Sequence, residues 1–460
     1  MLDIFTPIIP EDKLHPNFKV LRAESNRYAR NTISSWTEGF VDRDGKIIQE
    51  FQSTFNSSFW EFYLNASFNT LGFNIDYSYD RPDFLLDKGG RTYAVEATIS
   101  NHPDGAAPEW EKGPIPKITA DMWFQIINLS TIRLANAIFS KHKKFLNSYA
   151  KLDHVKNNPF ILCVAPFEQP LFFEQADNAI RRVLYKFSAP LYIKDEDTGK
   201  VRVVGEEHIE KVVKHNDQII DLGFFTNDKM KEISAIIFSN TATTTKAKAL
   251  DSANHPTTLF HATRFQQGAW DTPYSIVGLG EEYHETLLDG LHIFLNPFAE
   301  RPIDPDQFFS EEISLHTYDP VEELPLEFVN DGALLSHGCI SFHSKETIND
   351  LKLQQKDLEF KDYSFEWEED KLYPLTATVG TGMNNHLAHY CGWTIVVFQD
   401  SIDKDWGAFA KGEQVYTIQR FISLGDKKGM LSPHDFYDTK EAAFDEIKKL
   451  INEHVKLVSV

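Results

Sequence analysis

Residues 81–98 read RPDFLLDKGGRTYAVEAT, and this stretch decides the fold of the N-terminal part of the chain. Two apolar runs flank the turn sequence DKGG at 87–90, which is a pattern typical of a β-hairpin. Asp83 opens the first run, and Glu96 lies in the second. If the two runs pair as adjacent strands, their carboxylates meet at one end of a sheet. Such a pair of oxygen ligands suits Mg²⁺, which prefers oxygen atoms in an octahedron.

The segments around the hairpin predict the element order αβββαβ. Apolar residues at three-and-four spacing predict a helix over residues 48–72, and a short strand is expected at 73–77. Helical periodicity returns over 118–149. The continuous apolar run at 159–165 predicts a strand of a sheet that is covered on both faces. Residues 47–165 are therefore expected to form an α/β core with a mixed sheet.

Length and charge limit what the rest of the chain can do. A chain of 460 residues exceeds what one core usually serves, so two or three domains are expected. The net charge of −22 argues against a surface that coats phosphate backbones indiscriminately, because that binding depends on Lys and Arg. Lysines and arginines nevertheless gather within 112–156. They indicate either a local basic face or an ordinary solvated helix face.

Features that the sequence lacks indicate the cellular compartment and whether the protein contacts a membrane. Three cysteines, at widely separated positions, do not form a disulfide framework. The N-terminus lacks the pattern of a secretory signal, and no apolar run is long enough to span a bilayer. We therefore expect a cytoplasmic protein that has no membrane partner.

The order of acids and elements resembles that of the PD-(D/E)XK, or restriction-endonuclease-like, nuclease superfamily. Its pattern is a helix that bears an acid, then a Pro-Asp strand, then a Glu-x-Lys strand. Here the helix acid is Glu61, the Pro-Asp pair stands at 82–83, and the third motif reads Glu-Ala-Thr at 96–98. The chain is most similar to uncharacterised bacterial members that carry Glu-x-Thr in place of Glu-x-Lys.

The resemblance implies a role for each of these residues. Asp83 and Glu96 would bind Mg²⁺, or Mn²⁺ as a substitute, together with the main-chain carbonyl of Ala97. Glu61 would hold a metal-bound water or a second ion.

The lysine of the superfamily motif is replaced by Thr98, which carries no positive charge. A lysine from the following helix is expected to take its place. Lys141 and Lys144 are three residues apart and share one helix face. We favour Lys141 as the fourth catalytic residue, after Asp83, Glu96 and Glu61.

The pattern of apolar and polar segments also predicts a division of the chain. A nuclease domain is expected over 1–240, a mixed α+β region of unknown role over 241–345, and a small α+β module over 346–460. Within these parts we expect a short helix near 204–214, a linker over 241–256, and a C-terminal helix over 439–455.

The implied function is that of a metal-dependent endonuclease that hydrolyses phosphodiester bonds, with DNA the favoured substrate. A role in bacterial defence against foreign DNA would suit the resemblance. The sequence leaves open whether the chain binds a protein partner or forms a homodimer. The alternative is a degenerate nuclease fold that binds nucleic acid or a partner protein without cutting. A third hypothesis is a zinc-stabilised interaction protein, and its candidate ligands are His337, Cys339, His343, His386, His389 and Cys391.

Overall fold

The computed structural model divides the chain into two compact units. The first contains residues 1–186, 210–267 and 273–357, and the second contains 187–209, 268–272 and 358–460. The residues that the structure describes are 1–111, 120–194, 201–214, 218–265, 273–342, 370–374, 383–390, 393–399, 405–411, 430–431 and 435–458.

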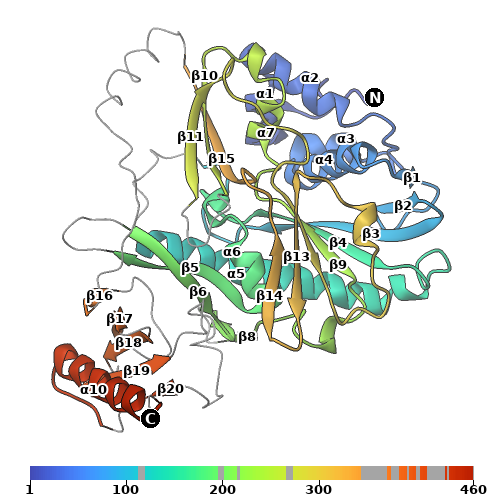
Figure 1. Cartoon of the computed structure of the whole chain (residues 1–460). Coiled ribbons are helices and arrows are strands. Elements are labelled where there is room, and N and C mark those ends of the chain that lie inside the picture. The colour runs from blue at the N-terminus through green and yellow to red at the C-terminus, as the bar shows by residue number, and fades with distance from the viewer. Residues whose placement is uncertain are drawn as a thin grey trace. The chain divides into compact units, whose positions relative to one another are not determined.

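A mixed eight-stranded sheet forms the centre of the first unit (Figure 1). In spatial order its strands are β1 (Asn74–Asp76), β2 (Phe84–Lys88), β3 (Arg91–Asn101), β4 (Phe160–Phe167), β9 (Ala235–Phe238), β12 (Leu291–Leu295), β13 (Ile313–Asp319) and β14 (Leu324–Phe328). The β3–β4, β4–β9 and β12–β13 pairs are parallel, and the other neighbours are antiparallel. The chain is thus an α/β protein with a mixed sheet.

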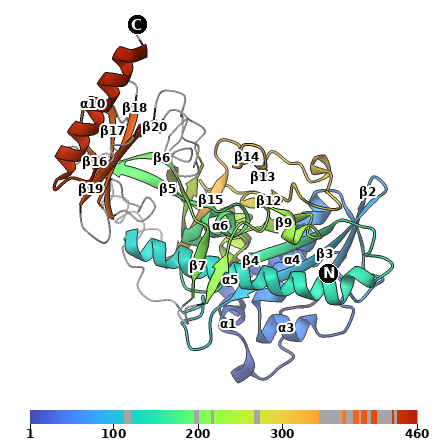
Figure 2. The same ribbon diagram turned by 90° about the horizontal axis from the view of Figure 1, so that it is seen from below.

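Helices cover both faces of this sheet. Among the described residues, the helices of the first unit are α1 (Pro16–Arg22), α2 (Arg27–Ser35), α3 (Ile47–Ser53), α4 (Asn56–Thr70), α5 (Ala120–Asn147), α6 (Asn178–Tyr185) and α7 (Thr244–Ala249). Figure 2 shows α5 running along β3 and β4. Every residue of β4 is buried, as expected for a strand with helices on both sides.

Helix α4 is an interior helix, because it buries residues on nearly every side of its axis. Its aromatic side chains join the core beside Val95, Ile161 and Cys163 of the sheet. Trp60 has a polar Nε1–H that needs a partner when buried, and it donates to the carbonyl of Cys163 at 3.2 Å. Glu61 is the one acidic residue that this helix carries.

The rest of the first unit consists of a small antiparallel sheet, a hairpin and single helical turns. The sheet contains β11 (Tyr274–Leu279), β10 (Thr258–Arg264) and β15 (Leu334–Ser341), and the hairpin β7 (Lys211–Val213) and β8 (Ile219–Asp221). The 3-10 turns are η1 (Glu11–Lys13), η2 (Glu24–Asn26), η3 (Tyr149–Lys151), η4 (Phe172–Gln175), η5 (Asp228–Met230), η6 (Ser252–Asn254) and η7 (Pro305–Gln307).

The second unit contains its own sheet and helix. The antiparallel hairpin of β5 (Phe187–Lys194) and β6 (Val201–His208) belongs to it. Its five-stranded sheet contains β16 (Tyr373–Pro374), β17 (Met383–Tyr390), β18 (Trp393–Gln399), β19 (Trp406–Lys411) and β20 (Met430–Leu431). Helix α10 (Lys440–Val458) packs its apolar face, including Ile447 and Ile451, on this sheet.

The predicted order αβββαβ is observed from α4 to β4, with differences in detail. The helix expected over 48–72 is divided into α3 and α4 at Phe55, whose φ of 62° is incompatible with a continuous helix. The helix expected near 204–214 is wrong, because this segment forms parts of β6 and β7. The C-terminal helix is confirmed as α10.

The expected domain boundaries differ from the observed units. The boundary at 240 falls within the first unit, because β12 pairs with β9 and continues the same sheet. Strands β12, β13 and β14, which lie within 241–345, therefore complete the sheet instead of belonging to a separate region. The module expected over 346–460 differs from the second unit, which takes 358–460 from this part of the chain and adds 187–209 and 268–272. Across the described ranges, no helix is long and apolar enough to cross a bilayer.

Candidate active site

The predicted site residues come from four neighbouring elements of the first unit. Asp83 directly precedes β2, Glu96 lies in β3, Glu61 lies in α4 and Lys141 lies in α5. The β2–β3 hairpin pairs Phe84 with Val95, so the residues before and after this pair lie at the same end of the hairpin. The hairpin that the sequence predicts thus brings the two carboxylates to one place.

Asp83 is fixed by the backbone of the opposite strand. Its Oδ2 accepts a hydrogen bond from the Ala97 N–H at 2.7 Å. Burial and the nearby Glu96 carboxylate raise the pKa of Asp83 to about 6, although Lys141 and the Ala97 N–H act in the opposite direction. An added cation would relieve this mutual repulsion of two close carboxylates.

Glu96 has one saturated oxygen and one free oxygen. Its side chain is 2% exposed. Oε1 accepts from Lys141 Nζ at 2.7 Å, Lys144 Nζ at 3.1 Å and Tyr149 Oη at 3.1 Å. Oε2 is buried and has no hydrogen-bond partner. A buried carboxylate oxygen without a donor is costly, so this oxygen is available to a further ligand.

Lys141 supplies the positive charge that Thr98 lacks. Its Nζ donates to Glu96 Oε1 and, at 3.2 Å, to the carbonyl oxygen of Ala97. Lys141 therefore contacts both Glu96 and Ala97, whose carboxylate and main-chain carbonyl are the expected metal ligands. Lys144 reaches the same Glu96 oxygen, but its side chain is 50% exposed against 23% for Lys141. The more enclosed amine is the one that sequence reasoning favoured.

Glu61 faces the same group of charges from α4. Burial first, and then the negative charge of Asp83, raise the pKa of Glu61 well above its usual range, while Arg43 opposes the shift. Arg43 is held nearby because its Nη1 donates to the carbonyls of Tyr79 and Pro82. The structure thus brings together all four predicted side chains and the Ala97 main chain.

The donor set fits a hard divalent cation. It consists of three carboxylates, one of them with a buried free oxygen, and a main-chain carbonyl. Mg²⁺ and Mn²⁺ favour such oxygen ligands, whereas soft metals favour sulfur and imidazole. Asp83, Glu96 and the Ala97 carbonyl are the groups that would hold the ion.

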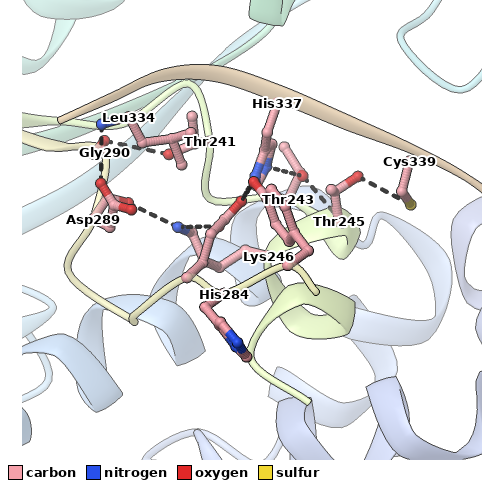
Figure 3. Close-up of polar contacts among 12 residues, drawn as sticks. Thr241, Thr243, Thr245, Lys246, His284, Asp289, Gly290, Leu334, His337 and Cys339 are labelled. Carbon is pink, nitrogen blue, oxygen red and sulfur yellow. Dashed lines mark hydrogen bonds and ion pairs between the residues drawn. The ribbon is translucent and has the colours of Figure 1, made fainter. Parts of the chain in front are cut away.

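A second polar cluster, which sequence reasoning missed, lies in the segment expected to be a linker. Figure 3 shows its side chains converging from α7, β15 and the loop before β12. Lys246 Nζ lies 2.6 Å from Glu285 Oε2 and donates to the Asp289 carbonyl at 2.8 Å. The side chains of Lys246, Glu285 and His337 have no exposed surface.

His337 completes this cluster. Its Nδ1 lies 2.7 Å from Glu285 Oε1, and its Nε2 lies 3.2 Å from Thr243 Oγ1. A hydroxyl, an imidazole and a carboxylate in this order form the relay of nucleophilic hydrolases. However, Thr243 caps α7 by accepting from the Thr245 N–H, and Glu285 also neutralises Lys246. We therefore interpret the cluster as a structural network.

His337, the first of the candidate zinc ligands, is part of this network. Both ring nitrogens of His337 are engaged by Glu285 and Thr243. Cys339 Sγ lies 3.7 Å from the hydroxyl of Thr245. His386 belongs to the second unit, and His343 and Cys391 lie outside the described residues.

Comparison of the chain with protein-family models, curated proteins and solved structures finds no match. The site is therefore interpreted from its own geometry and from the sequence pattern that predicted it.

Proposed function

We propose that this protein is a metal-dependent endonuclease that hydrolyses phosphodiester bonds, with DNA as its favoured substrate and a restriction-endonuclease-like core around the β2–β3 hairpin. One observation carries the proposal. Asp83, Glu96, the Ala97 carbonyl and Lys141 form one connected group, in which Lys141 bridges Glu96 and Ala97. A lysine amine beside a carboxylate ligand is what the third motif of the superfamily would otherwise supply at position 98.

Each residue has a separate task in this proposal. The chemistry that a bound Mg²⁺ supplies is polarisation of the phosphodiester and a lower pKa for an attacking water. Asp83 and Glu96 would hold the cation through their oxygens. Lys141 keeps Glu96 in place and offers a positive charge to the phosphate oxygens in the transition state. Glu61 accepts a proton from, or orients, the attacking water.

The surroundings of the site favour a polyanionic substrate in spite of the net charge of −22. Lys143 near the end of α5 and Lys151 in the segment that follows are exposed. Lys144 and Lys156 are exposed too, although they pair with Glu96 and Asp153. Positive side chains around a cleavage site attract phosphates even when the rest of the surface is acidic. The acidic surplus is greatest after Arg301, in sequence remote from these lysines.

The test is cleavage of supercoiled plasmid, single-stranded DNA and RNA by the full chain in Mg²⁺, Mn²⁺ or EDTA. Asp83→Asn and Glu96→Gln should each lower the cleavage rate by roughly 100-fold or more, because each loses a metal-binding carboxylate. Asp87→Asn is the matched control from the same hairpin. Its carboxylate only meets the Thr92 hydroxyl, at 3.4 Å, so cleavage should be unchanged.

Two results would decide against the proposal. Cleavage that survives in EDTA or in Asp83→Asn would remove the metal site from the reaction. Failure of the wild type to cut any of the substrates in either metal, with DNA still retarded in a gel, would instead favour a degenerate nuclease fold that binds without cutting.

A further inference from the structure

A group of metal-ligating side chains lies on the other half of the large sheet. His292 lies in β12 and His316 in the neighbouring parallel strand β13, while Asp177 occupies the N-cap position of α6. One ligand atom from each of the three lies within 4.8 Å of the others. None of these residues takes part in the proposed nuclease site.

The two imidazoles are buried and close to each other. His292 is 1% exposed and His316 is fully buried. His292 Nδ1 lies 3.1 Å from His316 Nε2. Two nitrogens that bind one tetrahedral zinc ion, with bonds of about 2.0–2.1 Å, are separated by roughly 3.3 Å. The observed separation therefore suits either a hydrogen bond or a shared ion.

The carboxylate beside the two rings is not used by its own helix. Asp177, although it stands at an N-cap, makes no side-chain capping bond to its helix. An imidazole in its neutral form has a ring nitrogen lone pair that it can offer to a cation.

The charges next to the group also favour a cation. Glu327 Oε1 lies 3.5 Å from His316 Nδ1 and 2.7 Å from Arg181 Nη2. A carboxylate behind a ligating histidine fixes the ring and increases its basicity, as in many zinc sites. Arg181 pairs with Glu327, and Asp177 adds a second carboxylate beside the two rings.

We propose that Asp177, His292 and His316 form a second metal site, which binds zinc through three side chains and links α6 to strands β12 and β13. Two imidazoles and a carboxylate are ligands that zinc accepts in proteins, whereas imidazoles do not suit Mg²⁺. Helix α6 already contacts these strands, because Tyr185 Oη donates to the carbonyls of Leu295 and His316. The ion would add a rigid link at the opposite end of this short helix.

The experiment measures metal content and zinc binding in the full chain, and it does not depend on nuclease activity. Chelator-treated protein is mixed with Zn²⁺ in competition with a chromophoric chelator, and with Co²⁺ to record the visible absorption of a tetrahedral site. The wild type should bind one Zn²⁺ at this site and gain thermal stability on binding. Asp177→Asn and His292→Gln should each weaken binding at least tenfold, and Glu327→Gln roughly 10- to 100-fold.

Two control variants make the result specific. His255→Gln changes another buried histidine, but it lies outside the group and should bind zinc as the wild type does. Asp83→Asn should also retain zinc, which separates this site from the nuclease site. Equal zinc affinity in wild type, Asp177→Asn and His292→Gln would overturn the proposal, as would a wild type that takes up no zinc. Asp177 is only partly buried, so Asp177→Asn tests binding without the risk of misfolding that a core change carries.

Discussion

Replacement of Lys246 by methionine should destabilise the first unit by about 3–5 kcal/mol, because it breaks a fully buried ion pair. Methionine keeps an unbranched side chain of similar length, so the change removes the charge with little loss of packing. The amine of Lys246 contacts Glu285 Oε2 at 2.6 Å and two main-chain carbonyls, those of Thr286 and Asp289.

The size of the effect depends on what remains around Glu285. Burial opposes its ionisation, but His337 and Lys246 together keep its pKa far below the ordinary range. Without Lys246, Glu285 keeps its contacts with His337 and the hydroxyl of Tyr283, but its side chain has no exposed surface and gains no water. Glu285 must then take up a proton or remain charged without its lysine, and either outcome costs folding free energy.

The assay is unfolding in urea at pH 7, followed by circular dichroism, with thermal unfolding as a second measurement. Lys248→Met is the matched control, because Lys248 lies on the same helix and its amine only meets the Ser341 hydroxyl, at 3.3 Å, near the surface. It should cost under about 0.5 kcal/mol. The double variant Lys246→Met, Glu285→Gln should recover part of the loss, because it removes the unpaired charge. Equal stability of the two single lysine variants would refute the reasoning.

Three further predictions test other parts of the molecule. Lys141→Met should lower the cleavage rate by roughly 100-fold, and Lys144→Met by less than about tenfold. The reason is that both amines contact Glu96, but of the two only Lys141 also contacts the Ala97 carbonyl. A larger loss of rate in Lys144→Met would contradict our assignment. Burial raises the pKa of Glu109 to about 7. The free energy of unfolding should therefore fall by about 1–3 kcal/mol as pH rises from about 4.5 to 7. Denaturation measured across this pH range should show no such fall in Glu109→Gln. Gly280→Ala should cost about 1–3 kcal/mol in the same measurement, because its Cβ would clash with the carbonyl oxygen of Ser252.

The central hairpin could be predicted because its information is local. The turn glycines and the two apolar runs fix the pairing of Phe84 with Val95, and this pairing brings Asp83 to the Ala97 N–H. The approach of Lys141 could also be foreseen, since a long helix after the hairpin must return across the sheet before β4. Sequence spacing alone could not decide which of Lys141 and Lys144 contacts the site, because both reach the same oxygen of Glu96.

The segment after β9 could not be predicted, because its stability comes from residues remote in sequence. Threonines and lysines over 241–256 predict a linker, yet Lys246 is buried against Glu285 and the Asp289 carbonyl. A buried lysine looks like a surface lysine in the sequence until its partners are known. The His292–His316 pair was missed for the same reason, since the two residues meet only through the pairing of β12 with β13.

The discontinuous second unit has a consequence for the order of events during synthesis. Its hairpin of β5 and β6 leaves the ribosome well before residues 358–460, which supply the rest of that unit. Synthesis adds about 5–20 residues per second, so the hairpin is complete on the order of ten seconds before residues 358–460 are available to it. During this interval its two strands have free edges that can pair with other chains. A nascent chain stopped before residue 358 should therefore recruit chaperones more strongly than the finished protein.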